Sequence, residues 1–123
     1  MKFVIPGKLD GLNNAINASR TNHYKANNMK RKAHIIVIQA IREAKLPKVT
    51  KYPIKVKTVW YEPNKRRDAD NVVAGGRKAI LDAMVEYGII EDDGIRFVDS
   101  FEDEVRCDRE NPRIEVEIIE RSD

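Results

Sequence analysis

Residues 54–61 of the 123-residue chain read IKVKTVWY. Apolar and basic side chains alternate along this stretch, which is the period-two pattern of a strand with one buried and one solvated face. We therefore expect a strand with a positively charged outer face, ended by Pro63. Trp60 and Tyr61 close the stretch among cations, where they would either pack in the core or stack on an exposed base. For Trp60 the core is the preferred interpretation.

Further elements are predicted on both sides of this strand, because the apolar spacing changes from two residues to three and four. In chain order they are a strand at 2–5, a short polar helix from Asp10 or Gly11 to about Ala18, helices at 22–44 and 71–87, and strands at 95–107 and 113–120. Gly75 and Gly76 inside the last helix indicate a kink or a close approach to another backbone. The sequence thus predicts one α+β domain over residues 1–123, with a mixed or antiparallel sheet of about four strands packed on two main helices.

The composition excludes several classes of protein. No apolar run approaches about 18 residues, so no transmembrane helix is expected, and Pro6 interrupts the N-terminal segment before a signal-peptide core. Cys107 is the only cysteine, which rules out an intrachain disulfide and a cysteine-based zinc site. Any metal would be held mainly by oxygen atoms, and a reducing cytoplasm is the expected location.

Charge is divided unevenly along the chain. Residues 1–67 carry 16 basic and 3 acidic side chains, whereas residues 68–123 carry 7 basic and 17 acidic ones. Basic surfaces of this density bind phosphate backbones through release of counterions. The first half therefore indicates a polyanionic partner, and the boundary between the halves falls at Asp68.

This boundary lies inside residues 65–71, which read KRRDADN. In an extended segment Asp68 and Asp70 project from the same side, so a divalent cation, a neighbouring arginine or a raised pKa must offset their repulsion. Carboxylate oxygens suit Mg²⁺, and Asn71 would add an oxygen or brace a carboxylate. Alternatively, Asp70 caps the following helix and Asp68 pairs with a preceding arginine. On spacing alone, this second interpretation is favoured.

Two further groups of polar residues follow these aspartates. The segment Glu91-Asp92-Asp93 is either a solvated turn or, if the sheet brings it back, part of the same site. Lys78 shares roughly one helical face with Asn71, so it would either contact a phosphate or form an i, i+4 pair with Asp82. Spacing alone favours the turn and the pair.

Taken together, three ordered blocks resemble the RusA family of Holliday junction resolvases. The blocks are Arg67-Asp68-Ala69-Asp70-Asn71, Lys78-Ala79-Ile80-Leu81-Asp82-Ala83-Met84 and Gly88-Ile89-Ile90-Glu91-Asp92-Asp93. The segment 5–13 also looks like the start of phage-type members. The resemblance therefore favours a phage or prophage origin over a host one, a choice that the sequence leaves open, and it implies the cytoplasm of a bacterial host.

The resemblance implies a small, dimeric endonuclease that depends on Mg²⁺, or on Mn²⁺ in its place, and cuts four-way or other branched DNA. Its paired catalytic and metal-binding aspartates correspond to Asp68 and Asp70, the third to Asp93, and its helix lysine to Lys78. The chain is about one helical turn longer before Lys78 than the shortest members, which makes Arg77 a rival for that role. Asp92 is the rival of Asp93. The expected DNA contacts are Lys65, Arg66, Arg67, Asn71 and Arg77.

The implied reaction is phosphodiester hydrolysis by a metal-activated water. Two opposed nicks suit a twofold dimer, whose interface we expect on a sheet edge or on the apolar faces of the helices. Three alternatives remain at this level: a non-catalytic DNA-binding protein, a nuclease for other branched DNA, and a structural module stabilised by a metal.

Overall fold

The computed structural model describes residues 1–7, 23–65, 73 and 76–121, and for 23–30 it describes the backbone only. Within this part of the chain, four strands and two helices follow one another. They are β1 (Lys2–Pro6), α2 (His23–Ala44), β2 (Ile54–Glu62), α4 (Gly76–Tyr87), β3 (Val98–Cys107) and β4 (Arg113–Glu120). The predicted α+β fold is thereby confirmed, while the short helix expected near residues 11–18 lies outside the described residues.

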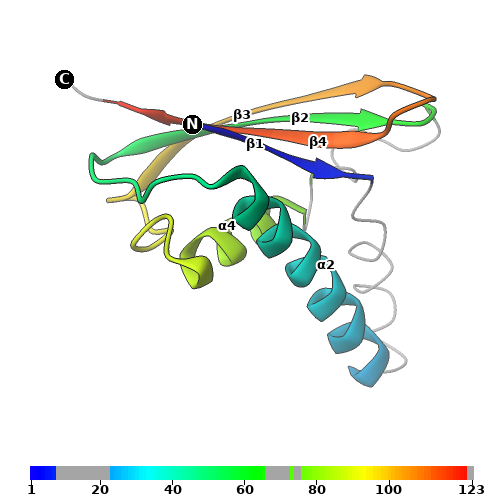
Figure 1. Cartoon of the computed structure of the whole chain (residues 1–123), viewed down its shortest axis with the longest axis horizontal. Helices are drawn as coiled ribbons and strands as arrows, with labels where there is room; N and C mark the ends of the chain where they lie inside the picture. The colour runs from blue at the N-terminus through cyan, green and yellow to red at the C-terminus, as the bar shows by residue number, and fades with distance from the viewer. Residues whose placement is uncertain (8–22, 66–72, 74–75, 122–123) are drawn as a thin grey trace.

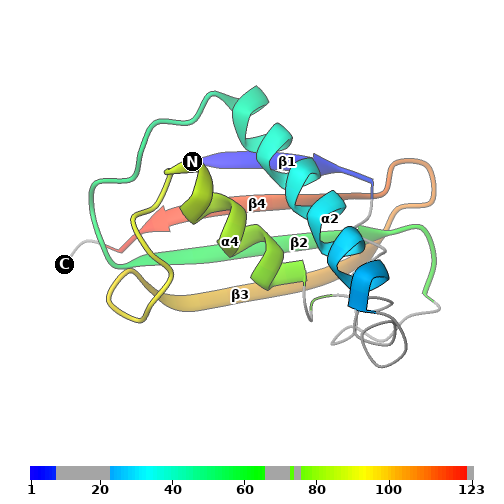
Figure 2. The ribbon, with the colours of Figure 1, turned by 90° about the horizontal axis from the view of Figure 1, so that it is seen from below.

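The four strands form one mixed sheet in the order β1-β4-β2-β3 (Figure 2). β2 runs parallel to β3 and antiparallel to β4, and β1 is antiparallel to β4. The strand predicted at residues 54–61 is therefore an inner strand with a neighbour on each side. β4, the last strand in the sequence, is the other inner strand.

Both helices pack on the same side of the sheet (Figure 1), which we call the covered face. Alternate residues of β2 point to this face, from Ile54 to Glu62, and are buried. They meet Val37 and Ile41 of α2 and, from α4, Ile80 and its neighbours. We call the opposite side the open face, because no described helix lies on it.

Two local expectations need correction. β3 begins at Val98 rather than at Ile95, because the N–H groups of Phe97 and Val98 both donate to Gly94 O at 2.9 Å and close a turn. Gly76 does make a close approach, but to a side chain rather than to a backbone: a Cβ at this position would overlap the indole of Trp60. The core position expected for Trp60 is confirmed, since only 3% of it is exposed.

The membrane expectation can be examined for the described helices alone. Neither of them is long and apolar enough to cross a bilayer.

Candidate functional site

Lys78 lies in the first turn of α4 and contacts two carboxylates. Its Nζ is 3.2 Å from Asp93 Oδ2 and 3.1 Å from Asp82 Oδ1. The intrahelical pair with Asp82 and the contact with the later acidic segment therefore exist together. The sequence had presented the pair as an alternative to a role in the site, whereas the structure places both carboxylates on the same ammonium group.

The segment after α4 brings Asp93 back beside the helix. Gly88 ends α4 with φ 93°, a left-handed conformation that glycine adopts without strain. Ile89 N donates to Met84 O at 3.0 Å, and Ile89 O accepts from Val49 N at 2.8 Å. Since Ile89 and Ile90 are both buried, the chain is anchored in the core before it turns outward at the acidic residues.

Tyr52 holds the same segment from the other side. Its hydroxyl donates to Val49 O at 3.1 Å and accepts from Glu91 N at 3.0 Å. Within the segment, Asp93 N donates to Asp92 Oδ1 at 2.8 Å. The Asp92 carboxylate is thus turned to the backbone, whereas the Asp93 carboxylate faces Lys78, a difference that spacing did not reveal.

Arg77 and Lys78 are adjacent in sequence, but their side chains contact different groups. Arg77 forms an ion pair with Asp103 of β3, and its guanidinium lies 4.4 Å from the centre of the Phe101 ring. Lys78 instead projects toward Asp93, with 68% of its side chain exposed. Of these two rival cations, Lys78 is the one in contact with the acidic segment.

The charge of Lys78 is reinforced by its neighbours. Hydrogen bonds from Lys78 to Asp82 first, and to Asp93 second, raise the pKa of Lys78 above its ordinary value. Burial opposes this shift only weakly, because the side chain is largely in water. The ammonium group therefore stays protonated at neutral pH.

The predicted site residues are only partly within the described part of the chain. Asp68, Asp70, Arg66, Arg67 and Asn71 lie outside the described residues. Of the three aspartates predicted to bind metal, Asp93 alone is described, and 28% of its side chain is exposed. The described residues contain no group of three or more histidine, cysteine, aspartate or glutamate side chains able to hold a metal ion.

The basic outer face expected for β2 is partly neutralised. Lys55 and Lys57 lie 2.9 and 3.3 Å from the carboxylate oxygens of Glu102. Lys65, by contrast, is exposed just beyond the end of β2. Positive charge available to a phosphate is thus less extensive on the open face than the sequence indicated.

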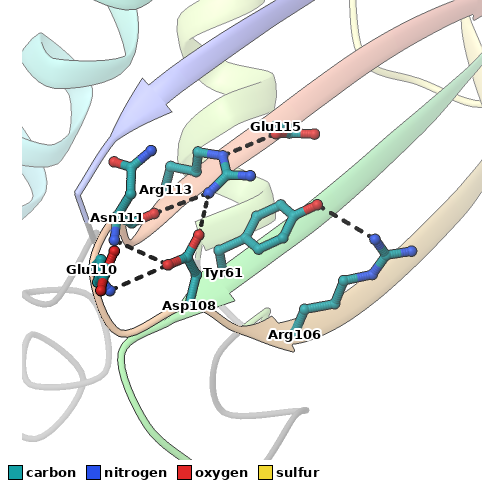
Figure 3. Close-up of polar contacts among 7 residues, drawn as sticks. All are labelled: Tyr61, Arg106, Asp108, Glu110, Asn111, Arg113 and Glu115. Carbon is teal, nitrogen blue, oxygen red and sulfur yellow. Dashed lines mark hydrogen bonds and ion pairs between the residues drawn. The ribbon is translucent and has the colours of Figure 1, made fainter.

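Tyr61 belongs to a cluster at the end of the sheet, shown in Figure 3. The Arg113 guanidinium lies 3.8 Å from the centre of the Tyr61 ring, and Arg106 donates to its hydroxyl at 3.4 Å. Asp108 accepts from Arg113 at 2.9 Å and from two N–H groups of the following turn. We call the seven residues drawn there the open-face cluster. One face of the Tyr61 ring is already occupied by an arginine, so a base cannot stack on that face.

Sequence reasoning missed the polar residues of the covered face. Thr58 is fully buried and Glu62 is 6% exposed, because both stand at inward positions of β2, although both are polar. The alternation that predicted the strand contained the signal, because a polar residue at an inward position needs a specific partner.

The comparisons with known proteins agree with this geometry. A family model described as Endodeoxyribonuclease RusA matches residues 2–119. No curated protein matches the chain. The matched range includes every described strand and helix almost completely, together with the acidic residues on both sides of α4.

Proposed function

The chain belongs to the RusA family of endodeoxyribonucleases, and we propose that it is a Mg²⁺-dependent endonuclease that resolves four-way DNA junctions. Enzymes of this class hydrolyse phosphodiester bonds within DNA. The observation that carries the proposal is the family match over residues 2–119. The contact between Lys78 and Asp93 supports the location of the active site.

The chemistry of the donor set fits a hard cation. Asp68, Asp70 and Asp93 would hold Mg²⁺ through carboxylate oxygens, the ligands that this ion prefers, or Mn²⁺ through the same atoms. Asp93 suits this role because it is partly exposed at the end of an anchored segment. When bound, the metal supplies an activated water and stabilises charge on the phosphate and the leaving oxygen.

The side chains of the protein then have distinct roles. Lys78 would neutralise charge that develops on the phosphate, and Asp82 and Asp93 orient its ammonium group from two sides. The exposed Lys65 and the predicted contacts Arg66, Arg67 and Asn71 would bind the DNA backbone on either side of the cleaved bond. The sequence also predicted a DNA contact for Arg77, but its guanidinium is paired with Asp103.

A homodimer would present two such sites to opposed strands of a junction. The sheet edges suit this interface poorly, because β1 ends at Pro6 and twofold pairing of β3 about Asp103 would set Glu102 against Glu104 of the second copy. The outer side of α2 suits it better. Ile35 and Ile36 are 56% and 38% exposed there, beside a hollow lined by Ile35, Ile38, Gln39, Arg42 and Glu43.

The dimer proposal is tested by replacing an exposed apolar residue with a charge. Ile35→Glu should convert the dimer to a monomer in sedimentation velocity, with the fold retained by circular dichroism. A wild-type chain that sediments as a monomer in the presence of junction DNA would contradict the proposal.

The active site is tested with synthetic four-way junctions in Mg²⁺. Four single variants are compared with wild type: Asp68→Asn, Asp70→Asn, Asp93→Asn and Lys78→Ala. Each should lower the cleavage rate constant by more than about a hundredfold. Loss of a residue that only supports a metal ligand usually costs about a hundredfold at most. Binding to the junction should survive the three aspartate substitutions, because loss of a negative charge does not weaken attraction to phosphate.

A matched control is Asp99→Asn. Asp99 lies on β3 and pairs with Arg121, so this variant loses a paired aspartate outside the proposed site and should cleave normally. Normal cleavage by Asp70→Asn would instead exclude the proposed active site.

Substrate choice is tested by a panel of four-way junctions, forks and flaps. Equal cleavage of all three would replace junction resolution by a broader activity on branched DNA.

A further inference from the structure

A series of hydrogen-bonded polar side chains crosses the covered face at the middle of β2. Trp60 Nε1 donates to Thr58 Oγ1 at 2.7 Å, and Thr58 Oγ1 donates to Asp103 Oδ1 at 2.5 Å. Thr58 is fully buried and Trp60 is 3% exposed. Thr58 and Asp103 face each other in the parallel register of β2 and β3. The direction of each hydrogen bond is fixed, because an indole N–H only donates and a carboxylate only accepts.

The series of polar contacts continues from the sheet to α4. The second carboxylate oxygen of Asp103 pairs with Arg77 Nη2, and the Arg77 guanidinium lies over the ring of Phe101 at 4.4 Å. One carboxylate therefore joins a hydroxyl of β2 to a cation of α4. We call Thr58, Trp60, Asp103, Arg77 and Phe101 the covered-face network.

The same tryptophan also fixes the preceding residue of the helix. Gly76 lies so close to the Trp60 indole that a Cβ would overlap its Cη2 and Cζ3 atoms. Two consecutive residues of α4 thus contact the network: Gly76 packs against Trp60, and Arg77 pairs with Asp103. The next residue is Lys78, whose Nζ reaches Asp93.

We propose that Asp103 and Arg77 are positioning residues, which set the rotation and height of the first turn of α4 so that Lys78 meets Asp93. This inference rests on the proposed function, in which Lys78 and Asp93 belong to the active site. A helix fixes the direction of each Cα–Cβ bond, so a small rotation at Gly76 and Arg77 displaces the base of the Lys78 side chain relative to Asp93. Displacements of about 1 Å in an active site lower rates by up to about a hundredfold.

The geometry also separates this role from direct DNA binding by Arg77. The Asp103 carboxylate forms an ion pair with the Arg77 guanidinium, and the Phe101 ring covers one side of the guanidinium plane. A phosphate would have to displace the carboxylate from that ion pair. A positioning role therefore predicts loss of turnover, whereas phosphate binding predicts loss of affinity and a smaller salt slope.

The decisive variants remove hydrogen bonds of the network, or the charge of Asp103, with little change in side-chain shape. Asp103→Asn and Thr58→Val should each lower the cleavage rate constant at saturating junction DNA by about tenfold or more, with the dissociation constant for the junction changed less than about twofold. Thr58→Ser keeps the hydroxyl and should restore nearly the wild-type rate. Trp60 is the only tryptophan, so its emission should shift in Thr58→Val and stay unchanged in Thr58→Ser.

The matched control lies in the open-face cluster. Asp108→Asn also removes a carboxylate that is paired with an arginine, Arg113, at the end of β3. It should lower stability while leaving the rate constant unchanged. Melting temperatures of all variants are measured, and rates are compared at a temperature where each is folded.

Each result bears on the inference in one direction. An unchanged rate constant in both Asp103→Asn and Thr58→Val would overturn it, as would an Arg77→Lys variant that loses junction affinity in proportion to its rate. Failure of the proposed function looks different. In that case Lys78→Ala and Asp93→Asn would cleave normally, and no role would remain for the network in placing them.

Discussion

Two carboxylates, Asp103 inside β3 and Asp108 just after it, are each held by an arginine, but they connect very different parts of the chain. Asp103 joins Thr58 of β2 to Arg77 of α4, partners that lie tens of positions away in sequence. Asp108 contacts Arg113 and the N–H groups of Glu110 and Asn111, all within five positions of itself (Figure 3).

This contrast shows what each brace can control. The open-face cluster shapes its own turn, so its loss is absorbed locally by water and by the exposed side chains around it. The covered-face network instead joins the start of α4 to β2 and β3 through side chains, in addition to the strand pairing and the core packing. Its loss also leaves buried polar atoms without partners, which costs about 1–3 kcal/mol for each group.

The largest expected difference between the two regions comes from their aromatic residues. Trp60→Ala should lower the free energy of unfolding by about 3–5 kcal/mol, because it empties a buried site. Tyr61→Ala should cost only about 1 kcal/mol, the order of a partly exposed cation–π contact. Urea denaturation followed by circular dichroism measures both, and equal losses would remove the distinction between the faces.

A smaller effect is expected at the helix start. In a helix, alanine is favoured over glycine by about 1 kcal/mol, yet Gly76→Ala should be destabilising because its Cβ overlaps Trp60. Forced overpacking costs about 1–3 kcal/mol. Gly94→Ala is the control, since a Cβ there meets no atom within 4 Å. A stabilised Gly76→Ala variant would mean that Trp60 moves aside freely.

The open-face cluster has its own signature in acid. The hydrogen bond from Arg113 first, and those from the N–H groups of Asn111 and Glu110, lower the pKa of Asp108 below its ordinary value. Its stabilising effect is then fully present above the unfolded pKa and is lost as the pH falls through the lower folded pKa. The stability difference between wild type and Asp108→Asn should therefore shrink in acid, as measured by thermal melts from pH 7 to pH 2. A constant difference would contradict this assignment.

The smallest effect is expected for the paired lysines of the open face. Glu102→Gln leaves Lys55 and Lys57 without their shared carboxylate. All three side chains are at least partly exposed to water, so the change in stability should be close to the error of measurement and should vanish in 1 M salt. A large loss that persists in high salt would show that this face is organised as firmly as the covered one.

Most of the fold could be predicted, because each element carries its own local pattern. The alternation of residues 54–61 and the spacing of the helices located β2, α2 and the described part of α4 within a few residues. The parallel pairing of β2 with β3 could not be read in this way. Which strands become neighbours depends on how the helices pack, and Gly94 alone did not indicate where β3 would begin.

The site was only partly predictable for the same reason. The resemblance singled out Lys78 and Asp93, which the structure brings together, but the partnership of Thr58 with Asp103 depends on strand register. A threonine inside an alternating strand signals a buried hydroxyl without naming its partner. Asp68 and Asp70 remain predictions, since they lie outside the described residues.

The central place of β4 has a consequence for how the protein is made. β1 pairs only with β4 among the described strands, and β2 needs β4 to complete one of its sides. During synthesis the first strand must therefore wait for residues 113–120 to leave the ribosome. Contacts this distant in sequence slow folding, and the apolar faces of Phe3 and Ile5 stay without their β4 neighbours until then. The sheet is thus expected to form in one late step, after residues 113–120 have been synthesised.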